Sequence, residues 1–130
     1  MLERRFTLAG RSLVPIVQGG MGVGISAHRL AGAVAREGGV GTIASIDLRH
    51  HHADLVAATE KSHDKDAINA ANLVALDREI RAAREGAQGN GLIAVNVMKA
   101  VESHAALVRQ ACESGADAIV MGAGDRKSVV

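Results

Sequence analysis

Residues 17–26 of the chain, VQGGMGVGIS, hold four glycines within six positions directly after an apolar run. Glycine is costly in conformational entropy, so it is usually kept where the backbone needs a positive φ or where another group must come close. The residues before it, 11–19 (RSLVPIVQG), have the character of a buried strand, and residues 26–39 (SAHRLAGAVAREGG) that of a helix with Ser26 as its N-cap. The stretch therefore predicts a strand-to-helix turn whose backbone is open to a ligand.

The rest of the chain repeats this alternation of strands and helices. Residues 40–47 (VGTIASID), 91–98 (GLIAVNVM) and 116–124 (ADAIVMGAG) are apolar runs typical of buried strands, and a helix is expected over 103–115. Strand–helix–strand units predict parallel strands joined by right-handed crossovers. Residues 48–90 are expected to form an elongated helical connection after the second strand.

Composition limits the classes of function. The 130 residues are 48% hydrophobic and carry a formal net charge of +1, so we expect one domain with a sizeable core and neither a nucleic-acid nor a membrane partner. Cys112 is the only cysteine, which excludes an internal disulfide. No apolar run reaches the about 18 residues that span a bilayer, and the start of the chain does not read as a signal peptide. The cytoplasm is therefore the expected compartment.

Two chemical interpretations of the glycine stretch compete, and both use backbone N–H groups and the positive end of the following helix. In the first, the G-x-G-x-x-A pattern of residues 22–27 binds a dinucleotide. Asp47 then stands about 20 residues further on, where an acid would bind the ribose. A purely structural alternative is that the glycines form only a tight turn.

In the second interpretation the stretch binds a flavin. Gly20 and Gly22 let a flat ring approach the backbone, because neither residue carries a Cβ. Met21 offers its N–H to a ring nitrogen and a soft apolar side chain to the ring. Asn96, at the end of the strand over 91–98, has both a donor and an acceptor for the polar edge of the flavin.

The order of three motifs carries a resemblance to a known family. PIVQGGMGVGISAHRLAGAVAREGGVGTIAS is followed by GLIAVNVM and then by GADAIVMGAG. In this combination the chain resembles the amino-terminal part of the nitronate monooxygenase family, formerly called 2-nitropropane dioxygenases. The resemblance covers nearly the whole chain up to Gly124.

The resemblance implies an α/β fold: a partial TIM (β/α)8 barrel of about the first four βα units, with residues 1–124 as the amino-terminal portion of an FMN-binding barrel. It implies a flavoprotein enzyme that oxidises alkyl nitronates with O₂ and FMN. Gly20, Met21 and Gly22 match the first flavin-contacting loop of the family, and Asn96 matches its polar flavin contact. The histidine of the family lies on a later strand, so the catalytic residue is expected beyond the end of this chain.

Four strands cannot close an eight-strand barrel, so the chain alone is expected to bind FMN weakly and to show no turnover. Residues 125–130 (DRKSVV) back-translate to a common sequencing adapter and are interpreted as a non-native read-through tail. Two alternatives stay open: a flavin-dependent enoyl-acyl-carrier-protein reductase and a non-catalytic, Rossmann-like dinucleotide-binding module. A homo-oligomer is compatible with each of them.

The remaining polar residues have structural interpretations. The run at 50–52 (HHH) is expected to be an exposed loop, and no metal site is predicted, because no carboxylate stands at ligand spacing. His28 is expected on a helix surface, and Lys99 is a weaker candidate for contact with cofactor or substrate. The charged residues of 77–85, Glu79 among them, are expected to form a solvated helix face.

Overall fold

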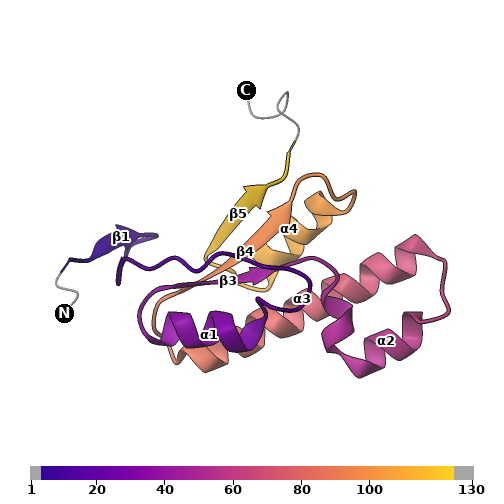
Figure 1. The fold of residues 1–130 in the computed structure, drawn as a ribbon, viewed down its shortest axis with the longest axis horizontal. Coiled ribbons are helices and arrows are strands. Elements are labelled where there is room, and N and C mark those ends of the chain that lie inside the picture. Colours follow the sequence, from indigo (N-terminus) through magenta and orange to yellow (C-terminus); the bar gives the residue numbers. More distant parts are fainter. Residues whose placement is uncertain (1–3, 125–130) are drawn as a thin grey trace.

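The computed structural model of the protein describes residues 4–124, so the tail predicted at 125–130 lies outside the described residues, as do residues 1–3. Strands and helices alternate through most of the chain (Figure 1). The strands are β1 (Phe6–Leu8), β2 (Arg11–Leu13), β3 (Val40–Ala44), β4 (Leu92–Met98) and β5 (Ala118–Gly122). The helices are α1 (His28–Arg36), the short 3-10 helix η1 (Leu48–His51), α2 (Ala53–Thr59), α3 (Lys65–Ala87) and α4 (His104–Glu113).

Two separate sheets are present in the described part of the chain. β3, β4 and β5 are parallel and adjacent in that order, whereas β1 and β2 form a separate antiparallel hairpin, at the left end of the view in Figure 1. The register places Ala44 beside Asn96 and Asn96 beside Val120. Since parallel strands run in one direction, the carboxyl ends of all three meet at the same edge of the sheet.

The main core lies between one face of the parallel sheet and the helices α1, α3 and α4. Side chains alternate along β4, so Ile93, Val95 and Val97 face these helices in one buried cluster. On the opposite face Leu92 packs with Leu13 of the hairpin in a smaller cluster. β4 thus buries both of its faces, which explains its continuous apolar sequence, whereas β5 at the edge of the sheet is half-buried or exposed.

The expected partial TIM barrel of four βα units is wrong. The parallel sheet of the described residues has three strands, and a separate antiparallel hairpin accompanies it. The first predicted strand, 11–19, is divided: Arg11–Leu13 belongs to the hairpin, and Val17 makes only an isolated bridge to Val40. Residues 4–124 form a small α/β domain with two small sheets.

The side chain of Gln18 explains why the first predicted strand does not form. Pro15 has no N–H to donate to a neighbouring strand. Two backbone hydrogen bonds of 2.9 Å, from Gln18 N–H to Val40 O and from Val40 N–H to Ile16 O, pair the segment with the start of β3. Beyond them the Gln18 amide itself pairs with Thr42, accepting from its N–H at 2.9 Å and donating to its carbonyl at 3.0 Å. A side chain therefore takes the place of the next backbone pair.

Small residues allow α1 to lie directly on β3 and on α3. A Cβ added to Gly41 of β3 would stand 1.8 Å from the carbonyl oxygen of Ala31 in α1. A Cβ added to Gly32 of α1 would stand 3.1 Å from the carbonyl oxygen of Ala83 in α3. Ala31 and Ala35 are completely buried at these contacts. This close packing holds α1, which follows the glycine stretch, directly against β3 and α3.

The connection after β3 is helical throughout most of its length and returns to the sheet as α3. That helix begins after Asp64, whose Oδ1 accepts a hydrogen bond of 2.9 Å from the N–H of Asp66. It ends at Gln88, which has the left-handed conformation common after helices. No helix formed by residues 4–124 has both the length and the apolar character that a membrane crossing requires.

Candidate functional site

The carboxyl ends of the three parallel strands and the glycine stretch surround one pocket of about 260 Å³. Crevices outside this edge of a parallel sheet are the usual ligand sites of α/β proteins, because several loops converge there. Three of the four residues predicted to bind a flavin, Gly20, Gly22 and Asn96, line this pocket together. The full lining is Gly20, Gly22, Ala44, Ser45, Ile46, Asn96, Met98, Gly122 and Ala123.

Hydrogen bonds around Ser26 hold the glycine stretch in place. The side chain of Ser26 is fully buried, and its hydroxyl accepts from the N–H of Met21 at 2.8 Å, while its own N–H donates to the carbonyl of Met21 at 2.9 Å. The amide of Gln18 also donates to this hydroxyl at 3.1 Å. Ser26 therefore closes the turn on Met21, and within the described residues its hydroxyl makes no cap bond to α1, contrary to the role expected from the sequence.

Met21 does not take the position predicted for it. Its N–H, which we expected to bond a flavin ring nitrogen, is used by the Ser26 hydroxyl. Its side chain is 57% exposed and is not part of the pocket lining. The predicted set of four residues is thus reduced to three that share a pocket.

The glycines at positions 20 and 22 are required by packing within the protein. A Cβ added to Gly20 would stand 2.8 Å from Cβ of Asn96, and one added to Gly22 would stand 2.3 Å from Cγ2 of Ile46. Contacts this short do not occur between real side chains, so the loop lies where it does only because these residues are glycines. The sequence interpretation attributed the missing side chains to a ligand. In the structure, Asn96 and Ile46 fill that space, and the loop backbone borders the pocket beside them.

Asn96 is the polar group best placed to orient a ligand in the pocket. It stands at the carboxyl end of β4, between Ala44 of β3 and Val120 of β5. Among the described residues its side-chain amide makes no hydrogen bond, so both its donor and its acceptor are available. The hydroxyl of Thr42, close to Gly20, is also buried without a hydrogen-bond partner in residues 4–124. An unpaired amide and an unpaired hydroxyl below the loop give this region unused hydrogen-bonding capacity.

Asp47, the ribose-binding residue of the dinucleotide interpretation, is directed to other protein groups. It has a left-handed backbone conformation with φ of 52°. Its carboxylate accepts from Nε of Arg49 at 3.1 Å and pairs with Nε2 of His50 at 3.2 Å. Asn72 of α3 donates to it at 3.4 Å. These contacts tie the end of β3 to the helical connection.

A second pocket of about 280 Å³ adjoins the first, and Ser45 and Ile46 line both. Residues of the connection, including Asn69 and Asn72, form one of its walls, and Ser103 stands before α4 on another. Sequence reasoning did not identify these residues, because the return of α3 over the end of β3 is a tertiary feature. Lys99 lies nearby at the end of β4, where its N–H donates to the carbonyl of Gly122 at 2.7 Å.

The prediction of a solvated Glu79 is wrong. Glu79 is 1% exposed, and the side chains of three histidines surround its carboxylate. Nδ1 of His28 lies 2.5 Å from Oε2, so this pair forms a short hydrogen bond. The helical spacing of apolar residues in α3 could have indicated that Glu79 is buried. Position 79 follows Leu76 by three residues and precedes Ala83 by four, and both of these side chains are fully buried.

No family model matches the chain, and no curated protein matches it. In residues 4–124 no group of three or more His, Cys, Asp or Glu side chains is arranged so that it could hold a metal ion.

Proposed function

We propose that the pocket at the strand ends binds the isoalloxazine ring of FMN and that the protein oxidises alkyl nitronates with O₂. The expectation of no turnover assumed a fragment with four barrel strands, whereas the parallel sheet of the described residues has three strands beside a separate hairpin. The observation that supports this proposal is the convergence of Gly20, Gly22 and Asn96 on one pocket. Asn96 stands 74 positions after Gly22 in the sequence, and each of the three residues matches a flavin contact in the family that the sequence resembles. The substrates proposed are a small nitronate and O₂, and the compartment proposed is the cytoplasm.

The size and chemistry of the pocket fit part of this cofactor. Its volume of about 260 Å³ lies just below the range of about 300–1,000 Å³ that is usual for small-molecule sites. It therefore fits a ring system better than a complete nucleotide. Ala44 and Met98 offer apolar surface to a ring, and the Asn96 amide offers a donor and an acceptor to its polar edge. Bound FMN would supply the redox chemistry, and the chain's own residues bind and orient it.

The dinucleotide alternative is less well supported. Dinucleotides bind where the order of strands in an open sheet reverses, which creates a crevice between diverging loops. Here β3, β4 and β5 follow one another in sequence order without a reversal. The carboxylate of Asp47 is also engaged by Arg49 and His50 rather than available to a ribose.

Titration of FMN into the purified chain, followed by flavin fluorescence, tests the binding step. We expect weak but saturable binding that Gly122→Val lowers at least tenfold, because valine would fill the pocket. A Cβ added to Gly122 meets no atom within 4 Å, so the variant is expected to keep the fold. Gly86→Ala, at an exposed position of α3 that does not line the pocket, is the matched control. Equal affinity for FMN in the wild type and in Gly122→Val would refute the assignment of this pocket.

Reaction with a substrate separates the three candidate functions. Anaerobic bleaching of the bound flavin by an alkyl nitronate, reversed by air, is the result expected for nitronate oxidation. Oxidation of NAD(P)H with an enoyl thioester would instead identify the enoyl reductase. FMN binding without either reaction would identify a binding module, and bleaching no faster than that of free FMN would contradict nitronate oxidation by this chain.

A further inference from the structure

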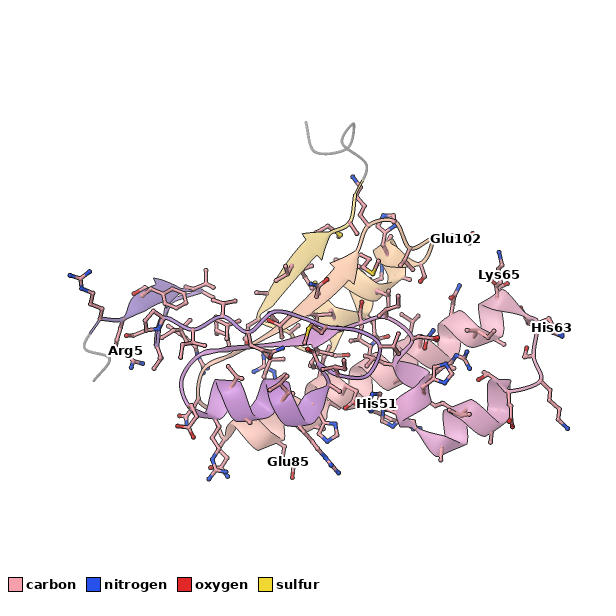
Figure 2. All side chains as sticks on the ribbon, in the orientation of Figure 1. Arg5, His51, His63, Lys65, Glu85 and Glu102 are labelled. Atoms are coloured by element: carbon pink, nitrogen blue, oxygen red, sulfur yellow. The ribbon has the colours of Figure 1, made fainter. Side chains whose placement is uncertain are left out.

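Three arginines gather around one pocket at the edge of the parallel sheet where β3 and β4 begin, opposite the strand-end pocket. This arginine pocket has a volume of about 490 Å³. Arg5, directly before β1, and Arg11, in β2, reach it from the hairpin, and Arg36 reaches it from the last turn of α1. Figure 2 shows Arg5 at the hairpin end of the molecule. The other lining residues are Ser12, Leu13, Glu37, Gly38, Gly89, Asn90 and Gly91.

Hydrogen bonds to the protein hold two of the three guanidinium groups in place. Arg5 donates from Nε to the hydroxyl of Ser12 at 2.8 Å and from Nη2 to the carbonyl of Ser12 at 2.9 Å. Arg11 donates from Nη1 to the carbonyl of Gly91, 80 residues further along the chain. A guanidinium group has five N–H donors, so both arginines keep donors that these contacts do not use.

Arg36 is the arginine with the most unused donors. Its guanidinium makes no hydrogen bond within residues 4–124, whereas its backbone carbonyl accepts one of 3.0 Å from the side-chain amide of Asn90. The segment beside it comes close to the hairpin, since a Cβ added to Gly38 would stand 4.0 Å from Nη2 of Arg5. The end of α1 and the hairpin thus present their guanidinium groups to the same space.

The charge of the arginine pocket is not neutralised by the protein around it. Within residues 4–124 none of its three arginines forms an ion pair with a carboxylate, in contrast to the three arginines of α3. Its lining holds three positive charges and one negative charge, that of Glu37, which gives a formal net charge of +2. The carboxyl-terminal ends of α1 and α3 lie beside the pocket, and each adds about half a negative charge. The pocket therefore stays positive and attracts an anion.

We propose that the arginine pocket binds the phosphate group of a small phosphorylated molecule. The planar N–H fork of arginine matches phosphate oxygens in a bidentate manner, more specifically than a point charge does. A phosphate ester carries a charge of about −1.5 to −2 at pH 7, which is complementary to the lining. The volume of about 490 Å³ lies within the range of about 300–1,000 Å³ that is usual for small-molecule sites, so it leaves room for the organic part of the ligand.

The rest of the chain favours a small molecule over a nucleic acid as the ligand. The formal net charge of the whole chain is +1, and Phe6 is its one aromatic residue. Nucleic-acid surfaces depend on many basic contacts along the phosphate backbone and, for single strands, on aromatic side chains that stack on bases. Here the positive charge is concentrated in one pocket.

The arginine pocket is separate from the pocket proposed to bind the flavin ring. The two share no lining residue. They lie at opposite ends of β4, whose seven residues span roughly 20 Å at about 3.3 Å per residue. The ligand is therefore expected to be a second molecule, and the inference does not depend on the function proposed above.

Calorimetric titration of glycerol 3-phosphate and of inorganic phosphate into the full chain, at about 0.15 M NaCl, tests the proposal. We expect one molecule of glycerol 3-phosphate per chain and competition from inorganic phosphate. Arg36→Gln is expected to weaken the binding at least tenfold, and Glu37→Gln to strengthen it at least twofold, because that variant removes the negative charge of the lining. Arg29→Gln is the matched control, since Arg29 is exposed at the other end of α1 and does not line the pocket.

Four results would overturn the proposal. The first is the absence of saturable binding of glycerol 3-phosphate, and the second is binding of inorganic phosphate alone, which would identify a site for the free ion. The third is an equal loss of affinity in Arg29→Gln and Arg36→Gln, which would show diffuse attraction by surface charge. The fourth is displacement of glycerol 3-phosphate by a single-stranded oligonucleotide at lower concentration, which would identify a nucleic-acid site. Gly122→Val is expected to bind glycerol 3-phosphate as the wild type does, so this test and the FMN titration can fail independently.

Discussion

Replacing Gly41 by alanine is expected to destabilise the protein severely, because helix α1 lies directly on this residue. The added Cβ would stand 1.8 Å from the carbonyl oxygen of Ala31, 2.6 Å from its carbonyl carbon and 2.8 Å from its Cα. All three are backbone atoms of a helix, so no side-chain rotation can relieve the contact. α1 would have to move away from β3 by more than about 1 Å before a normal carbon–oxygen contact of about 3.2 Å is restored.

The expected loss in the free energy of unfolding follows from the packing contacts that such a movement of α1 breaks. Overpacking a core usually costs about 1–3 kcal/mol, and occasionally more. Here the shift also loosens Ala31 and Ala35, which are fully buried, and each CH₂ or CH₃ group returned to water costs about 0.8 kcal/mol. We therefore expect a loss of about 3–4 kcal/mol in the free energy of unfolding. This is a large fraction of the about 5–15 kcal/mol that is typical of a domain.

Urea denaturation followed by circular dichroism measures this loss, and thermal denaturation is expected to show a Tm lowered by roughly 10–15 °C. Gly86→Ala is the matched control, since its Cβ would have only one neighbour, the Cα of Gly32 at an ordinary contact distance of 3.8 Å. That variant lies near the end of α3 and is expected to be neutral or slightly stabilising. A Gly41→Ala protein within about 1 kcal/mol of the wild type would show that α1 does not pack on β3 as described.

Two further predictions concern other contacts of the fold. Gln18→Leu is expected to lower the free energy of unfolding by about 2–3 kcal/mol, because it leaves the N–H and carbonyl of Thr42 without partners. Urea denaturation of the variant measures this loss, and an unchanged midpoint would contradict the prediction. The pKa of Asp77 lies below its ordinary value of 3.8, mainly because of the hydrogen bond with the Ser114 hydroxyl and, after it, because of Arg81. These contacts of the Asp77 carboxylate therefore stabilise the folded state above about pH 4, and the stabilisation is lost as the pH falls below 3.8. Asp77→Asn is accordingly expected to cost about 1 kcal/mol at pH 7, and the difference from the wild type is expected to shrink at pH 3; a difference independent of pH would refute the reasoning.

Local patterns in the sequence predicted most of the helices and strands. The runs at 40–47, 91–98 and 116–124 contain β3, β4 and β5. Uninterrupted Val, Ile and Ala sequences are typical of strands covered on both faces, and β3 and β4 are such strands, whereas β5 is half-buried or exposed. The prediction failed at 11–19, where the pattern was equally apolar. Pro15 and the amide of Gln18 decided the outcome there, and the pairing of a side chain with a distant backbone cannot be seen in periodicity.

At the candidate sites, too, some features were predicted from the sequence and others appeared only in the tertiary structure. Gly20, Gly22 and Asn96 were identified by motif and resemblance, and the structure brings them to one pocket, but the reason for the glycines is their contact with Asn96 and Ile46. The carboxylate of Glu79 was assigned to solvent because a charged residue in a charged run is normally exposed. Its burial depends on histidines that are remote in sequence, which no local pattern reveals.

By itself the sequence determined the approximate positions of the helices and of the parallel strands β3, β4 and β5, since these depend on the spacing of apolar residues and on glycine and proline within a few positions. Only the tertiary structure decided how many strands share the sheet, which space the glycines leave open and where the charge of Glu79 is placed. Those outcomes depend on contacts between segments tens of residues apart, whose energies arise only after the segments have packed together.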